Sequence, residues 1–186
     1  SLKEHIKWFD DFINGIKLDK KIILVIHDWG SAIGFDFAKK YPERIAGIVY
    51  MEAIVCPMKW SNWPENATKV FKLMRSDAGE ELILEKNIFV ERILPSSIIR
   101  KLSDEEMSNY RKPFLKAGSD RQPTLSWPRQ IPLNDEPTEV VDIVRKYSEF
   151  MKINNIKKLF INADPGSILI GQQREFCRKW NNQKEV

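Results

Sequence analysis

One short segment limits what this chain can fold into more than any other part of it. Residues 22–26, IILVI, form an apolar β-branched run, and HDWG follows at 27–30. A continuous run of this kind predicts a strand buried on both faces of a parallel sheet. The next residues have helical spacing and end near Lys40, just before Pro42. A strand, a very short turn and a helix form the elbow that exposes a nucleophile at the edge of a sheet.

The rest of the chain repeats the alternation of strands and helices on either side of a different middle part. Apolar residues at helical or strand spacing predict an α/β fold, with a mostly parallel sheet flanked by helices. Helices are expected at 3–16, after the elbow as far as about Lys40, at about 139–152 and at about 171–180. Strands are expected at 22–26, 44–50 and 157–163.

The middle part contains no run that would predict a buried strand. Three amphipathic segments, at 69–76, 80–94 and 103–116, predict helices, and Ser103 with Glu106 fits a capping box. We therefore expect a core at 1–55, a helical cap at 56–135 and a second part of the core at 136–186. Three strands would leave both sheet edges unpaired, so the sheet is expected to be incomplete in this chain.

Composition excludes several classes of function. Among 186 residues the net charge is only +4, with both signs interspersed, which argues against nucleic-acid binding. No apolar run reaches the roughly 18 residues of a transmembrane helix. Cys56 and Cys177 are isolated, which predicts neither a zinc site nor a disulfide and favours the cytoplasm. The oligomeric state is left open.

Asp28 is the candidate nucleophile of the elbow. A carboxylate is ionised at pH 7 and can attack an sp³ carbon without a base, which suits displacement of a halide or opening of an epoxide. Gly30 and Gly34 predict a helix that packs closely, whereas Ile26 breaks the usual preference for a small residue two positions before the nucleophile. The alternative is that Asp28 only caps the helix. Trp29 favours the catalytic interpretation, since an indole has no capping role and its N–H suits a departing anion.

Glu52 is the second candidate. It follows the next apolar run, so it is expected at the same edge of the sheet as Asp28, where it could orient a histidine. The alternative is an ordinary surface glutamate at the end of a strand.

The segments VIHDWGSAIGFDFAKKYPERIAGIVYMEAI, RQPTLSWPRQIPL and LFINADPG resemble the haloalkane dehalogenase family and its branch of Renilla-type luciferases. The resemblance implies the α/β-hydrolase fold with a helical cap inserted after the strand that ends near Glu52. It implies that Asp28 displaces halide to form an alkyl-enzyme ester, that the Trp29 indole holds the halide while its backbone N–H serves the oxyanion hole, and that Glu52 is the acid. It further implies a small apolar substrate, either a haloalkane or a coelenterazine-like molecule, and no cofactor or metal.

The same resemblance places further residues near the substrate pocket, although ordinary packing explains each of them equally well. These residues are Trp63, Ile88, Phe89, Pro128, Asp164, Pro165 and Gly166.

The sequence departs from the family where the catalytic base is expected. Its only histidines are His5, upstream of the elbow, and His27, whose side chain should point away from the attacking face. The family's base follows a further strand, so we expect the chain to be the central part of a longer protein. These 186 residues alone are expected not to turn over.

Three alternatives to the dehalogenase remain open. A coelenterazine-oxidising luciferase would use the same core residues. An epoxide hydrolase would take its acid at Asp164 and hold the epoxide oxygen with tyrosines such as Tyr110 and Tyr147. A non-catalytic protein could bind small apolar molecules under the cap.

Overall fold

The computed structural model describes residues 1–63 and 65–186, which form two compact units. The sheet unit comprises Ser1–Pro64 and Pro132–Val186, and the helical unit comprises Glu65–Ile131. The helical unit lies within the range 56–135 that the sequence assigns to a cap. None of the helices in the described residues is both long enough and apolar enough to cross a membrane.

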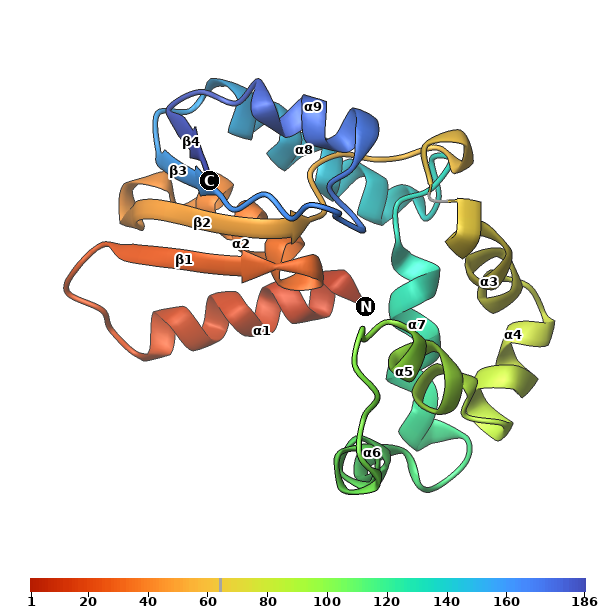
Figure 1. Ribbon diagram of the computed structural model, residues 1–186. Coiled ribbons are helices and arrows are strands. Elements are labelled where there is room, and N and C mark those ends of the chain that lie inside the picture. Colours follow the sequence, from red (N-terminus) through yellow and green to blue (C-terminus); the bar gives the residue numbers. More distant parts are fainter. Residues whose placement is uncertain (64) are drawn as a thin grey trace. The chain divides into compact units, whose positions relative to one another are not determined.

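The sheet unit is built on four parallel strands that lie side by side in sequence order (Figure 1). The strands are β1 (Ile22–His27), β2 (Ile45–Ala53), β3 (Lys157–Phe160) and β4 (Gln183–Glu185). The pairing is in register across the sheet: Val25 lies opposite Val49, and Val49 lies opposite Leu159. The predicted strand at 157–163 is shorter than expected, and β4 was not predicted because QKE contains no apolar residue.

The burial of β1 corrects the expectation of a strand covered on both faces. Leu24 and Ile26 are buried, whereas Ile23 and Val25 are 64% and 69% exposed. Since side chains alternate between the two faces of a strand, only one face of β1 is covered by the described residues. The apolar run predicted the strand correctly, but it could not show how many layers cover it.

Helices of the sheet unit enclose an aromatic core. They are α1 (Leu2–Gly15), α2 (Asp28–Lys40), α8 (Thr138–Ile153) and α9 (Gly171–Arg178). The α2 helix packs against α1, α8 and strands β1 and β2. Phe35 of α2 lies at the centre, with ring centroids 5.3–5.6 Å from those of Tyr50, Tyr147 and Trp180. This packing fixes α2 against the sheet, and α2 begins at the elbow.

The helical unit consists of short segments rather than three continuous helices. Its α-helices are α3 (Glu65–Arg75), α4 (Ala78–Glu80), α5 (Leu94–Ser96), α6 (Asp104–Arg111) and α7 (Gln122–Gln130). The helix predicted at 80–94 is instead two π-helical segments, Glu81–Glu85 and Phe89–Ile93, separated by Asn87 with a φ of +53°. The capping box of Ser103 and Glu106 is confirmed. The α7 helix was not predicted, because prolines at 123 and 128 obscure its pattern.

Candidate active site

The elbow places Asp28 on a strained backbone at the end of β1. Its φ is +46°, in the left-handed region that residues other than glycine rarely adopt. His27 occupies the N-cap position of α2, and no side chain makes a capping hydrogen bond there. Asp28 opens α2 with non-helical backbone, and its role as a nucleophile stays a prediction. Strain of this kind often marks a functional position.

Ser31 joins the elbow to the neighbouring strand. Its fully buried hydroxyl donates a hydrogen bond to the backbone oxygen of Asp28 and accepts one from the backbone N–H of Ile54 at 2.9 Å. Asp28 also forms a parallel bridge with Ala53, the residue after Glu52. The ends of β1 and β2 are therefore held together, which brings the two candidate carboxylates to the same edge of the sheet.

Close packing of α2 on β1 depends on Gly34. A Cβ atom at this position would lie 2.8 Å from the Ile26 Cγ2 atom, so the bulky Ile26 fits because residue 34 has no side chain. The sequence prediction is thus confirmed for Gly34. It is wrong for Gly30, where a Cβ would meet no atom within 4 Å.

The environment of Asp28 shifts its ionisation. Burial raises the pKa of the Asp28 carboxyl above its ordinary value, while a hydrogen bond from the backbone N–H of Trp29 and the nearby His27 lower it. Removal of solvent destabilises the charged carboxylate relative to its solvated state. A half-buried carboxylate of this kind is a better nucleophile than a fully hydrated one once it is ionised.

Glu52 is held by the backbone of a distant loop. Its φ is +37°, and its Oε2 atom accepts hydrogen bonds from the backbone N–H groups of Ser167 and Ile168, both at 2.6 Å. Its Oε1 atom accepts a longer bond of 3.4 Å from the N–H of Leu169. Glu52 is therefore not a freely solvated surface glutamate.

The loop that contacts Glu52 is closed by one arginine. Arg174 donates to the backbone oxygens of Leu169, at 2.8 Å, and Ala163, at 3.0 Å. A Cβ atom on Gly166 would lie 3.0 Å from Glu52 Oε1 and 3.1 Å from Arg174 Nη2. Only glycine leaves the space beside Oε1 open.

Other residues singled out in the sequence lie in different parts of the molecule. Trp29 is the second residue of α2 and is half-buried, and Trp63, also half-buried, packs edge-on against Trp60. Asp164 and Pro165 are exposed in the turn before Gly166.

Ile88, Phe89 and Pro128 belong to the helical unit. Ile88 and Phe89 pack against the apolar cluster of that unit, which consists of Met74, Ile83 and Leu125. Pro128 is buried within α7. Their predicted place at the substrate pocket remains a prediction.

The two histidines take no part in the hydrogen bonds described for the Glu52 carboxylate, although His27 lies opposite Met51 in the β1–β2 pairing. His5 is on α1, with Nδ1 2.9 Å from the backbone oxygen of Ser1, and His27 is exposed at the end of β1. Within residues 1–63 and 65–186, no histidine hydrogen-bonds to Glu52.

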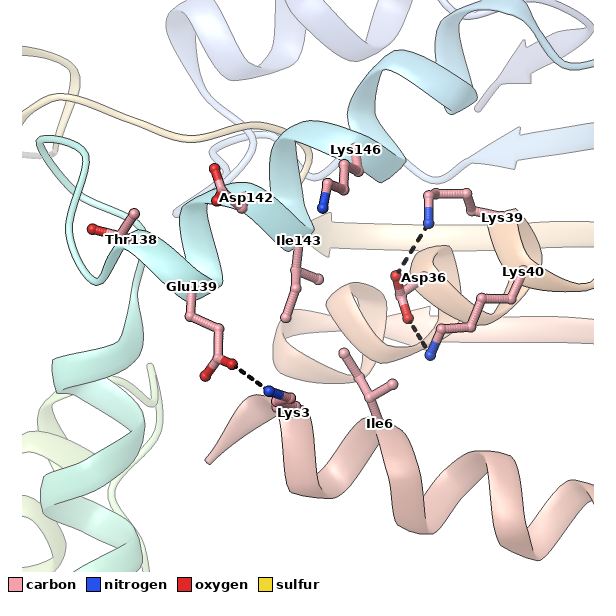
Figure 2. A pocket seen from close by; sticks show the side chains of 10 residues that line it. All are labelled: Lys3, Ile6, Asp36, Lys39, Lys40, Thr138, Glu139, Asp142, Ile143 and Lys146. Carbon is pink, nitrogen blue, oxygen red and sulfur yellow. Dashed lines mark hydrogen bonds and ion pairs between the residues drawn. The ribbon is translucent and has the colours of Figure 1, made fainter.

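A separate groove of about 590 Å³ lies between α1, α2 and α8 (Figure 2). Its charges are largely paired within the groove: Asp36 binds Lys39 and Lys40, and Lys3 binds Glu139. None of the predicted site residues lines it. In the part of the chain that the structure describes, no group of three or more His, Cys, Asp or Glu side chains could hold a metal ion.

Sequence reasoning missed the residues that hold the two carboxylates. Ser31 could have been found from its position three residues after Asp28, where a hydroxyl commonly bonds to the backbone at the start of a helix. The amides of residues 167–169 have no side-chain signature, and Arg174 acts through backbone oxygens, so neither left a pattern in the sequence.

Comparison with known proteins agrees with this geometry. The profile of the alpha/beta hydrolase fold family matches residues 1–184. A haloalkane dehalogenase from Sphingobium indicum is 50% identical over 183 residues, which is 98% of this chain and 62% of that protein. The coelenterazine h 2-monooxygenase of Renilla reniformis is 40% identical over 168 residues, 89% of this chain and 54% of that protein.

Solved structures give the same result. A haloalkane dehalogenase from Bradyrhizobium elkani superposes with a TM-score of 0.91 at 32% identity, over all of this chain and 64% of that one. The chain thus spans less than two thirds of the length of the relatives it matches. Since the family profile covers residues 1–184, the chain belongs to the alpha/beta hydrolase fold family.

Proposed function

We propose that the full-length gene product hydrolyses carbon–halogen bonds of small apolar haloalkanes, with Asp28 as the nucleophile. The observation that carries this proposal is the half-buried Asp28 carboxylate on a left-handed elbow at the start of α2. The 50% identity to the Sphingobium enzyme supports the same substrate class.

The reaction follows from the chemistry of these groups. An oxygen of the Asp28 carboxylate attacks the carbon that bears the halogen, and the electrons of the carbon–halogen bond leave with the halide. The indole N–H of Trp29 donates to the departing halide. Water then attacks the ester carbonyl and gives its proton to a general base, which releases the alcohol and restores Asp28. Glu52 orients this base.

Bromide release from a short bromoalkane tests the proposal in the full-length gene product. We expect continuous release from the wild type and none from Asp28→Asn, whose amide is not nucleophilic. Glu52→Gln should release about one bromide per protein and then stall as the alkyl ester. A folded wild type that releases no bromide and gains no alkyl mass would falsify the proposal.

A coelenterazine-oxidising activity is the second candidate. It is favoured by one observation, the 40% identity to the Renilla monooxygenase. Light emission with coelenterazine, together with no bromide release, would establish it in place of the dehalogenase.

The epoxide hydrolase alternative has little support in the structure. Tyr147 is fully buried in the sheet unit and donates its hydroxyl to the backbone oxygen of Ile54, so it is not available to an epoxide. Asp164 is exposed, whereas Glu52 is the carboxylate held in place. A non-catalytic binding protein would bind the bromoalkane without bromide release or alkyl adduct.

The proposal includes a cytoplasmic location and partners limited to small apolar molecules. The free thiols of Cys56 and Cys177 support a reducing compartment. The absence of nucleic-acid partners rests on the small net charge of +4.

A further inference from the structure

We propose that Arg174 is a positioning residue for Glu52 and thereby controls hydrolysis of the alkyl ester but not its formation. This inference rests on the proposed function. Arg174 does not touch Glu52 through a hydrogen bond of its own; it acts through the loop from Ala163 to Leu169.

The first step of the argument is the geometry of the loop. Its two ends carry the two carbonyls that Arg174 binds, Ala163 O through Nη2 and Leu169 O through Nε. A guanidinium is planar and presents its N–H groups in a fixed fork, so it sets the spacing of these two oxygens. The fork therefore determines the curvature of the loop between them.

The second step is the effect of that curvature on Glu52. Consecutive backbone N–H groups of residues 167–169 converge on one carboxylate, with two short bonds to Oε2 and one long bond to Oε1. Oε2 is thereby occupied by the loop, while Oε1 keeps acceptor capacity for a further donor. An imidazole N–H is the donor that a general base would present to a carboxylate.

The third step is the space beside Oε1. Gly166 leaves it open, because a Cβ there would approach Oε1 to 3.0 Å. The loop thus has two functions: its amides fix one oxygen of Glu52, and its glycine keeps the other accessible. Arg174 maintains both.

The consequence differs for the two chemical steps. Attack by Asp28 on the alkyl carbon uses the elbow and needs no base. Ester hydrolysis needs a base that Glu52 holds in place, and a displacement of about 1 Å can cost about a hundredfold in rate. Loss of Arg174 should therefore slow the second step selectively.

The test compares Arg174→Gln with Arg178→Gln in the full-length gene product. Arg178 lies on the same helix, and among the described residues it binds the side chains of Glu175 and Glu185 rather than the 163–169 loop, so it is a matched control. With 1-bromobutane, we expect Arg174→Gln to retain the first stoichiometric release of bromide. Its steady-state rate should fall about 10- to 100-fold, and intact-mass measurement should show a butyl adduct on Asp28.

Two further measurements separate positioning from general damage. Low millimolar guanidinium ion should partly restore turnover in Arg174→Gln, because the side chain is only half-buried. Backbone amides of residues 167–169 should exchange hydrogen faster in Arg174→Gln than in Arg178→Gln.

The possible outcomes are distinct. Equal turnover in the two variants, or parallel loss of both chemical steps in Arg174→Gln, overturns the role of Arg174. A wild type without bromide release or adduct overturns the proposed function instead. In that case the hydrogen exchange of the 167–169 amides decides about Arg174 separately. An unchanged rate in Arg174→Gln overturns the inference, and a faster rate supports the claim that Arg174 holds the loop in place.

Discussion

At the scale of single residues, the site depends on two carboxylates that both occupy left-handed backbone. Asp28 has a φ of +46° and Glu52 a φ of +37°. Conformations of this kind cost about 1–3 kcal/mol each and persist only where surrounding contacts enforce them. Ser31 enforces the first, and the amides of residues 167–169 enforce the second. The two candidate carboxylates are thus held in place by a neighbouring hydroxyl and by backbone amides.

Asp28→Asn should increase stability at neutral pH. Burial raises the pKa of Asp28, so the fold favours the protonated form. The stabilising effect of that proton is complete below the ordinary carboxyl pKa and is lost as the pH rises through the folded-state pKa. At pH 7 the ionised group therefore destabilises the fold. We expect Asn, which tolerates the same φ, to raise the free energy of unfolding by about 1 kcal/mol.

Urea unfolding of the wild type and Asp28→Asn at several pH values measures this difference. The difference in the free energy of unfolding between the two proteins should become smaller as the pH falls. Asp11→Asn, which changes an exposed carboxylate in a surface ion pair, serves as the control and should have little effect. A less stable Asp28→Asn at pH 7 would contradict the prediction.

The two cysteines should be unreactive in the folded protein. Burial raises the pKa of Cys56 and of Cys177 to about 11, so at pH 8 only about one thiol in a thousand is ionised. A disulfide reagent should label neither cysteine on the time scale of minutes, and should label both in urea. Rapid labelling of native Cys56 would show that its environment is more open than described.

At the scale of elements, the junction of β1 and α2 is the most demanding contact. Ile26 is buried, and it reaches the axis of α2 only because residue 34 is glycine. Elbows of this kind usually have a small residue at the position of Ile26. Here the residue is large, and the missing side chain of Gly34 provides the space for it.

Gly34→Ala should destabilise the protein by about 2 kcal/mol, since an added methyl group would overlap Ile26. Gly30→Ala is the matched control on the same helix, and it should be neutral or stabilising by up to about 1 kcal/mol through helix propensity. Thermal unfolding of both variants checks this. Equal changes in stability for the two substitutions would mean that α2 can move away from Ile26 without loss of stability, which would contradict the prediction.

A double-mutant cycle with Ile26→Ala makes the contact itself measurable. The variant that combines Gly34→Ala and Ile26→Ala should be more stable than the sum of the two single effects predicts. The methyl group added at 34 fits into the space that the shortened side chain at 26 leaves.

Elements were predictable where local pattern decides them and not where tertiary contacts do. Periodicity identified β1, α1 and α8 to within one residue at each end, β2 to within three residues, and the end of α2 at Lys40. It failed for β4, whose three polar residues form a strand only because β3 lies beside them. It also failed at 80–94, where Asn87 with positive φ interrupts a pattern that is otherwise helical.

The site was predictable only in part, and for the same physical reason. Asp28 and Glu52 follow apolar runs, so the sequence shows their place at the ends of strands. Their candidate roles come from resemblance and remain proposals. Ser31 and Arg174 bind backbone oxygens, and Gly166 leaves space beside Glu52 Oε1. Such contacts depend on three-dimensional approach rather than on residue type.

At the scale of the whole molecule, the two units are stabilised in different ways. The sheet unit has an aromatic core around Phe35. The helical unit has a small apolar cluster of Met74, Ile83 and Leu125, and in addition arginines that bind backbone oxygens. Arg121 is only 9% exposed and donates to carbonyls from two segments, 84–85 and 114–115. These bonds supply donors to carbonyl groups at the ends of short helical segments, of which that of Leu84 also accepts from the backbone N–H of Gly118.

Arg121→Met should therefore destabilise the helical unit by about 3 kcal/mol, because it leaves several partly buried carbonyls without donors. Arg111→Met is the control, since its ion pair with Glu91 is exposed and contributes at most about 1 kcal/mol. Hydrogen exchange should accelerate in residues 65–131 of Arg121→Met and stay unchanged in β1 and β2. Uniform acceleration over both units would show that they unfold together.

The arrangement around Ser31 and the 163–169 loop has an evolutionary consequence. All the contacts described for the two carboxylates come from the sheet unit, so the helical unit can accumulate substitutions without disturbing them. Substitutions in residues 65–131 can then be selected while the contacts of Asp28 and Glu52 are inherited intact. Homologous sequences should accordingly differ more in that range than at positions 28, 31, 52, 166 and 174.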